Sequence, residues 1–247
     1  MPADTRPNES TRAYESARPA DPLGTVVVTG GASGLGAAIA AAVEAEGGTP
    51  VVLDRRPPPN GLAFHAVDLA RPRDAEAVVR AIADEHGGLD AVVTAAGTDA
   101  CGDILDVDPD AWDRVVAVNL LGTAAVVRGA LPALERSRGR VVTVASTLGL
   151  RALPAATAYC ASKFGVVGFT RALASELGDR VGVTLLVPGG MKTHFFDDRP
   201  EDFKPGPDQL LNDPADVART VVFALRQPAG CELRELVVAP AGEPSWP

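Results

Sequence analysis

The sequence predicts a single α/β domain with a doubly wound, Rossmann-like fold, in which a parallel sheet of about seven strands carries helices on both faces. Three observations support this class. Short runs rich in valine alternate with longer helical stretches, as expected for a buried parallel sheet. A glycine-rich turn follows the first run directly, as in nucleotide-binding folds. The chain has 247 residues, 46% of them hydrophobic, which is enough for one sizeable core.

The elements follow in order from apolar runs and helix-end signals. Two Asp-Pro pairs, at 108–109 and 213–214, each place a capping carboxylate before a proline that suits the first turn of a helix. The Gly-Gly pair at 47–48 ends the first helix. We expect strands near residues 25–29, 49–53, 62–66, 89–94, 140–145, 181–187 and 235–239, with helices between them.

The composition limits the class of partner. Residues 1–22 are rich in Pro, Arg, Glu, Ser and Ala without an apolar run, so we expect a flexible extension there and a catalytic domain over 23–247. The sequence contains no run of about 18 uninterrupted apolar residues, so we do not expect a membrane span. The net charge of −9 is unfavourable for binding nucleic acid. We therefore expect a soluble, cytoplasmic protein that acts on small molecules.

The cysteines and histidines give no sign of a metal site. Cys101, Cys160 and Cys231 are odd in number and far apart, which predicts reduced thiols. The histidines are likewise scattered along the chain. We predict that no metal is bound.

The glycine-rich turn predicts a dinucleotide site. Gly30, Ser33, Gly34, Leu35 and Gly36 lie between the first strand and an alanine-rich helix. Glycines permit a tight turn and close approach to a pyrophosphate, while amides at the helix start donate to its oxygens. The spacing matches neither G-x-G-x-x-G nor the P-loop, and a bare glycine turn is the alternative.

The end of the second strand bears on the choice of cofactor. Asp54 stands where a dinucleotide fold places an acid on the adenosine ribose. This carboxylate would repel the 2′-phosphate of NADP, although Arg55 and Arg56 follow and could offset the repulsion. The sequence therefore predicts NAD, with NADP as the alternative cofactor. An ordinary strand-end acid is the other interpretation of Asp54.

Four polar residues predict proton chemistry. Tyr159 and Lys163 have a spacing that puts both on one helix face, where the cation could stabilise a phenolate. Ser146 ends a predicted strand and could hold a substrate oxygen. Asn119 places an amide in an apolar helical stretch, where an unpaired polar group would cost about 1–3 kcal/mol, so it needs a partner. An exposed helical pair is the alternative for Tyr159 and Lys163.

Together these motifs resemble the short-chain dehydrogenase/reductase family over about residues 24–240. The resemblance implies that Tyr159 is the general acid/base, and that Lys163 lowers its pKa and holds the nicotinamide ribose. It implies that Ser146 orients the substrate oxygen and that Asn119 anchors a water of a proton relay. The motifs that carry it are 29–36, Asp68, 94–97, Asn119, Ser146, Tyr159, Lys163 and 188–193.

The resemblance also implies further cofactor contacts. Asp68 and Leu69 would border the adenine, and the residues of 188–193 would wrap the nicotinamide carboxamide. The family's usual Asn-Asn-Ala-Gly is Thr-Ala-Ala-Gly at 94–97, which removes two amides but no catalytic group. The full set of expected contacts is Gly30, Ser33, Gly34, Leu35, Gly36, Asp54, Arg55, Asp68, Leu69, Ala95, Ala96, Gly97, Tyr159, Lys163, Pro188, Gly189, Met191 and Thr193.

The segment near 194–212 interrupts the strand–helix rhythm and is the expected substrate lid. Its phenylalanines could cover a hydride-transfer site, and Arg199 and Lys204 could meet an acidic or phosphorylated substrate. The alternative is a loop packed on a neighbouring subunit, since the resemblance implies a homodimer or homotetramer.

The predicted function is hydride transfer between NAD and a secondary alcohol or ketone, with Tyr159 exchanging the hydroxyl proton. Three alternatives stay open: an NADPH-dependent ketoreductase of acyl or polyketide intermediates, an epimerase or dehydratase that retains its cofactor, and a non-enzymatic NAD(H) sensor. A sensor needs no proton donor, so the intact Ser146, Tyr159 and Lys163 set argues against it.

Overall fold

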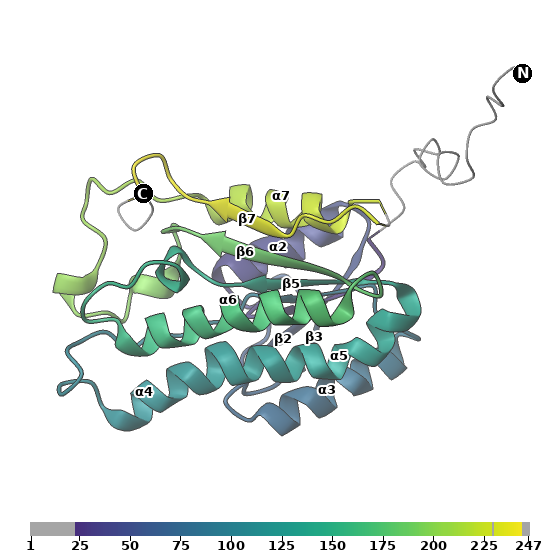
Figure 1. The fold of residues 1–247 in the computed structure, drawn as a ribbon, viewed down its shortest axis with the longest axis horizontal. Coiled ribbons are helices and arrows are strands. Elements are labelled where there is room, and N and C mark those ends of the chain that lie inside the picture. Colours follow the sequence, from purple (N-terminus) through teal and green to yellow (C-terminus); the bar gives the residue numbers. More distant parts are fainter. Residues whose placement is uncertain (1–22, 229, 244–247) are drawn as a thin grey trace, which may run out of the picture.

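The computed structural model describes residues 23–228 and 230–243, so the predicted extension over 1–22 lies outside the described residues. A seven-stranded parallel sheet with the order β3-β2-β1-β4-β5-β6-β7 forms the middle of the domain (Figure 1). The predicted Rossmann-like architecture is confirmed. The strands are β1 (Thr25–Thr29), β2 (Thr49–Asp54), β3 (Ala63–Ala66), β4 (Ala91–Thr94), β5 (Arg140–Val144), β6 (Gly182–Pro188) and β7 (Glu235–Val238).

The strand ends differ from the predicted ones by a residue or two. The largest difference is at β4, which begins at Ala91 instead of residue 89. Leu89 is only 1% exposed, so its sequence signal is that of a buried strand residue. Asp90 instead uses its carboxylate to accept a 2.7 Å hydrogen bond from the Thr25 amide, which aligns the starts of β4 and β1.

Two of the helices begin at the predicted Asp-Pro caps. The Asp108 side chain accepts a 2.9 Å hydrogen bond from the Ala111 amide, and the Asp213 side chain accepts one of 2.8 Å from the Ala215 amide. Each cap is followed by proline in the first turn. The helices are α2 (Gly34–Ala45), α3 (Pro72–Glu85), α4 (Pro109–Val116), α5 (Thr123–Ser137), α6 (Thr157–Leu177) and α7 (Pro214–Leu225).

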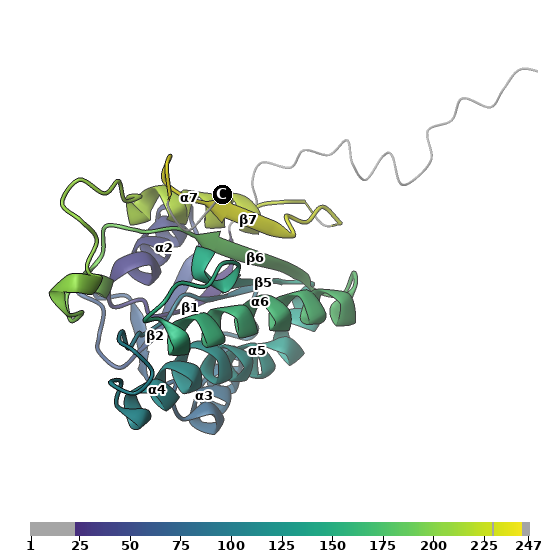
Figure 2. The ribbon, with the colours of Figure 1, turned by 60° about the vertical axis from the view of Figure 1, so that its left-hand side comes forward.

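Helices cover both faces of the sheet. Helices α2 and α7 pack on one face, and α3, α5 and α6 pack on the other (Figures 1 and 2). Alternate strand residues supply the two cores: Val26 and Val28 of β1 face α2 and α7, whereas Val27 faces α3 and α5. All three valines are fully buried. This alternation explains why the strands are apolar without interruption.

Helices α4 and α5 are joined by the π-helical segment η1 (Ala117–Gly122) into one run, Pro109–Ser137. By length and composition this run could cross a membrane, but half of its most apolar window is buried in the domain. It packs against α3 and α6. The same apolarity is expected of a helix in the core of an α/β domain, so it is weak support for a membrane span.

Candidate active site

The cleft lies at the carboxyl ends of the strands, where the strand order turns. Strands β1 and β4 are neighbours in the sheet, and the helices that follow them lie on opposite faces. Where two neighbouring strands lead to opposite faces, a crevice forms at the carboxyl ends of the strands. The cleft has a volume of about 1100 Å³. It extends from the glycine turn, past Tyr159 and Lys163, to the 194–212 segment. The described site thus has room for a dinucleotide and a small second ligand.

The glycine turn packs so tightly that side chains are excluded. Gly30 has φ +72, and a Cβ there would lie 2.8 Å from the Ala96 Cα. A Cβ on Gly36 would lie 2.3 Å from the Gly30 carbonyl oxygen. Helix α2 begins at Gly34, so its first amides lie at the cleft. This cradle fits a pyrophosphate bound by amides at a helix start.

Asp54 is fixed at the end of β2 by backbone amides. Its Oδ2 accepts a 3.1 Å hydrogen bond from the Ala32 amide of the glycine turn. Its Oδ1 accepts bonds of 2.7 Å from the Arg55 amide and 3.2 Å from the Arg56 amide. These bonds hold a negative charge at the cleft wall, which Arg55 and Arg56 also line.

Asp68 is held by an arginine that sequence reasoning missed. The Nη2 atom of Arg114, on α4, donates to both carboxylate oxygens of Asp68, at 3.1 and 3.0 Å. Burial opposes ionisation of Asp68, but the Ala70 amide and the Arg114 guanidinium outweigh it and lower its pKa. Asp68 therefore lies in the cleft wall as an anion that already accepts hydrogen bonds from Ala70 and Arg114.

Three of the predicted catalytic side chains lie close together in the cleft. Tyr159 and Lys163 lie on α6, and the Lys163 Nζ is 5.6 Å from the centre of the Tyr159 ring. Lys163 is 4% exposed and donates a 2.9 Å hydrogen bond to the Val144 carbonyl at the end of β5. Ser146 follows β5 and is hydrogen-bonded to the Tyr159 hydroxyl. Strand β5 and helix α6 thus bring a hydroxyl, a phenol and an amine together.

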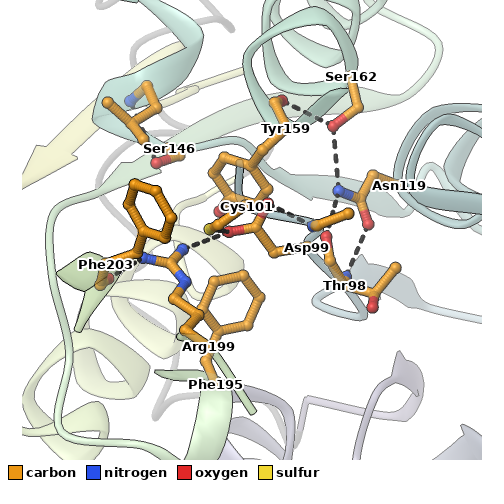
Figure 3. A network of polar contacts seen from close by, with 12 residues as sticks. Thr98, Asp99, Cys101, Asn119, Ser146, Tyr159, Ser162, Phe195, Arg199 and Phe203 are labelled. Atoms are coloured by element: carbon orange, nitrogen blue, oxygen red, sulfur yellow. Dashed lines mark hydrogen bonds and ion pairs between the residues drawn. The ribbon is translucent and has the colours of Figure 1, made fainter. Parts of the chain in front are cut away.

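Asn119 has the partners that its burial requires. Its Oδ1 accepts a 2.8 Å hydrogen bond from the Thr98 amide, and its Nδ2 donates to the Thr98 carbonyl at 2.9 Å and to Ser162 Oγ at 3.0 Å (Figure 3). Asn119 lies in η1, and no pattern in the sequence indicates that this stretch is π-helical. The residue joins the loop after β4 to α6, which carries Tyr159.

Burial controls the protonation of the pair on α6. Burial raises the pKa of Tyr159, and Asp99 acts in the same direction, while the bond from Ser146 and the charge of Arg199 oppose it. Burial lowers the pKa of Lys163 to about 8, against the attraction of Asp99. The charges that act on the Tyr159 pKa include those of Asp99 and Arg199, and the expectation that Lys163 lowers this pKa stays a prediction. Burial thus favours the neutral phenol of Tyr159 and opposes the phenolate.

The 194–212 segment covers the cleft with two short 3₁₀ helices, η3 (His194–Phe196) and η4 (Glu201–Phe203). The Phe195 ring lies 5.6 Å from the Tyr159 ring. Arg199 forms an ion pair with Asp99, and Lys204 forms one of 3.0 Å with Glu201. Both basic residues expected to meet an acidic substrate are thus already engaged with carboxylates of the chain.

Glu243, near the end of the described chain, also reaches the site. It is 9% exposed, and its Oε2 accepts a 2.9 Å hydrogen bond from the Gly190 amide in the expected nicotinamide loop. A Cβ on Gly189 would lie 2.5 Å from the same oxygen. Sequence reasoning missed Glu243 because nothing in its neighbourhood indicates contact with a loop 53 positions earlier.

The unusual Thr-Ala-Ala-Gly segment keeps one hydrogen bond behind the cleft and leaves another group unused. The Ala96 amide donates to Thr29 Oγ1 at 3.0 Å. Thr94 is 2% exposed, and within the described residues its Oγ1 finds no partner. A buried hydroxyl without a partner destabilises the folded state.

We therefore expect Thr94→Val to raise the free energy of unfolding by about 1 kcal/mol, because the substitution removes the unpaired hydroxyl and keeps the shape. Thr29→Val is the matched control, and it should lower that free energy by about 1–2 kcal/mol by leaving the Ala96 amide unpaired. Urea unfolding at pH 7 measures both. Destabilisation by Thr94→Val would mean that the hydroxyl has a bonding partner in solution.

Known proteins are similar to this chain over most of its length. A family model described as short chain dehydrogenase matches residues 24–204. An uncharacterized oxidoreductase of Staphylococcus aureus strain MW2 is 33% identical over 226 residues, which cover 87% of this chain and 96% of the relative. The D-beta-hydroxybutyrate dehydrogenase of Rhizobium meliloti strain 1021 is 34% identical over 186 residues, covering 68% of this chain and 72% of the relative.

Solved structures show the same fold. A variant of actinorhodin polyketide ketoreductase with NADPH superposes with a TM-score of 0.77 at 27% sequence identity. The alignment covers 88% of this chain and 95% of that one. The shared architecture therefore includes nearly all of both chains.

Proposed function

Because this chain belongs to the short-chain dehydrogenase/reductase family and is an oxidoreductase, we propose that it transfers a hydride between NAD and a secondary alcohol or ketone. The observation that carries this proposal is the meeting of Ser146, Tyr159 and Lys163 in one cleft with the glycine cradle. The nicotinamide cofactor supplies the hydride chemistry when it is bound.

The residues of the chain have separate roles in the proposed reaction. Ser146 orients the substrate oxygen, and Tyr159 gives its hydroxyl proton to a ketone oxygen or takes the proton of an alcohol. Lys163 holds the nicotinamide ribose and stabilises the phenolate that proton donation leaves. Asn119 anchors a water that connects Lys163 to solvent. The place of the Tyr159 hydroxyl, inside the cleft and hydrogen-bonded to Ser146, supports its role in proton transfer.

The 194–212 segment acts as the substrate lid in this proposal. Phe195 covers the Tyr159 ring, and this contact excludes water from the reacting atoms. The bond from Glu243 to the Gly190 amide positions the loop that wraps the nicotinamide carboxamide. We also expect the enzyme to be cytoplasmic and to form a homodimer or homotetramer.

Asp54 is the basis for proposing NAD. We expect Asp54→Asn to shift the ratio of NADH to NADPH affinity by about 100-fold toward NADPH, because the variant loses the charged acceptor for the ribose and the repulsion of a 2′-phosphate. An asparagine oxygen can still accept the Ala32 amide, but its NH2 group cannot accept the Arg55 and Arg56 amides, so thermal melting checks that the variant is folded. Cofactor fluorescence titration measures both affinities.

The exposed Asp84, outside the cleft, gives the matched control, since Asp84→Asn makes the same change of charge. It should leave the ratio unchanged. Tighter binding of NADPH than NADH by the wild-type chain would contradict the role of Asp54. That result would instead favour the second candidate, an NADPH-dependent ketoreductase, for which Arg55 and Arg56 at the cleft wall are the supporting observation.

A further inference from the structure

An ion pair closes the substrate side of the cleft beside Tyr159. Arg199 comes from the lid, Asp99 comes from the loop after β4, and the Arg199 Nη2 donates to the Asp99 Oδ2 (Figure 3). The side chains are 16% and 5% exposed, and both residues line the cleft. Two opposite charges, one from the lid and one from the loop after β4, therefore meet beside Tyr159.

Arg199 is held by the lid and keeps one donor unused. Its guanidinium lies 5.3 Å from the centre of the Phe195 ring and 4.6 Å from that of Phe196. Its Nη1 donates to the Phe203 carbonyl at 3.3 Å. Its Nε is buried and finds no hydrogen-bond partner within the described part of the chain. The guanidinium is thus held in place, and one of its hydrogen-bond donors has no acceptor among the described residues.

Asp99 is held by its own loop, independently of the lid. Its Oδ1 accepts a 2.8 Å hydrogen bond from the Ala100 amide, and its Oδ2 accepts one of 3.1 Å from the Cys101 thiol. Burial raises the pKa of Cys101 to about 12, and the bond to Asp99 adds to this effect, so the thiol stays neutral. The Asp99 carboxylate therefore faces the cleft whether Arg199 is paired with it or not.

We propose that Asp99 and Arg199 are a specificity-determining pair that selects an uncharged alcohol or ketone and excludes a carboxylate-bearing substrate. The pair leaves this wall without net charge, so a neutral molecule can be enclosed without breaking it. A carboxylate bound to Arg199 would either displace Asp99 or lie beside it, and two carboxylates would then share a buried site. This inference rests on the proposed function for the reaction and adds the charge class of the substrate.

The test compares two probes that differ in charge and share the reacting ketone, 4-oxopentanoate and its methyl ester. Binding to the full chain in the presence of oxidised NAD is measured by calorimetry, so that no turnover is needed. The wild-type chain should bind the ester at least about ten-fold more tightly than the acid, which is the scale of one charged hydrogen bond.

Variants of the pair should move this preference in opposite directions. Asp99→Asn keeps an oxygen for Arg199 but removes the opposing charge, so affinity for the acid should rise about ten-fold relative to the ester. Arg199→Met leaves Asp99 alone and should disfavour the acid further. The double variant should lose the gain of Asp99→Asn. Asp113→Asn, an exposed change of the same charge on α4, should change nothing.

Three results would overturn the proposal: equal wild-type affinity for acid and ester, no gain for the acid in Asp99→Asn, or a gain that persists when Arg199 is also removed. Thermal melting of each variant checks that it is folded. If Asp99→Asn does not fold, the shift in Arg199→Met decides, and an unchanged ratio there also overturns the proposal. A charge-dependent shift without turnover of any ketone would uphold this pair and reject hydride transfer.

Discussion

Tyr159→Phe should lower kcat by a factor of about 10²–10⁴, the usual contribution of a positioned general acid or base. The substitution removes the hydroxyl that meets Ser146 and leaves the ring that packs against Phe195 and Lys163. The cofactor cradle is untouched, so NADH affinity should change by no more than about two-fold. Steady-state kinetics with a panel of alcohols and ketones, together with NADH fluorescence titration, measure both quantities.

Trp112→Phe is a suitable control for that experiment. It removes one hydrogen bond of an aromatic side chain, the 3.1 Å bond from Trp112 Nε1 to Thr157 Oγ1 at the start of α6. Activity should stay near that of the wild type. If Tyr159→Phe retained more than about a tenth of the wild-type rate, another group would be the acid. If the wild type bound NADH and turned over no member of the panel, the sensor interpretation would gain support.

Lys163→Met should have effects of opposite sign on activity and stability. Loss of the ammonium removes the group proposed to hold the ribose and stabilise the phenolate, so kcat/KM should fall by about 10²-fold. The same ammonium is 4% exposed and is costly to bury, because burial lowers its pKa from 10.5 to about 8. Below pH 8 the folded state should therefore gain up to about 3 kcal/mol from the substitution.

The stability gain should depend on pH in a defined window. Between about pH 8 and 10.5 the folded wild type has released the Lys163 proton while the unfolded chain still holds it. Wild-type stability from this group therefore rises with pH across that window. The advantage of Lys163→Met should be full below pH 8 and should disappear by about pH 10.5. Urea unfolding at a series of pH values measures it.

Lys192→Met serves as the stability control, since Lys192 is exposed. Its effect on unfolding should be small at every pH. A Lys163→Met variant less stable than the wild type at pH 7 would contradict the burial cost. It would instead mean that the 2.9 Å bond to the Val144 carbonyl contributes more than the ammonium loses by leaving water.

Features that depend on neighbouring residues could be predicted from the sequence, and features that depend on contacts between distant positions could not. The strands and the residues at their carboxyl ends could be predicted, because alternation of apolar runs is local and parallel strands end at one edge. This places Ser146, Asp54 and the glycine turn together before any contact is known. The roles proposed for them came from resemblance, since geometry alone does not name a reaction.

Interactions between distant positions could not be predicted. Arg199 and Asp99 stand 100 positions apart, and Arg114 and Asp68 stand 46 apart. Their side chains are ordinary in the sequence, and only the packing of lid, helix and loop brings them into contact. For Arg199, which could meet an acidic substrate by its sequence alone, the structure adds a carboxylate of the same chain as its partner.

The π turn at η1 has a consequence for the length of the chain. A turn closed by i→i+5 bonds holds one residue more than an α-helical turn, so the run from α4 to α5 is longer by one residue than a regular helix would need. Removing that residue would let the run continue as an α-helix, with α5 still packed on α3. The Asn119 amide would then leave Thr98 and Ser162. The extra residue thus turns the Asn119 amide toward the loop after β4 and toward α6, which carries Tyr159.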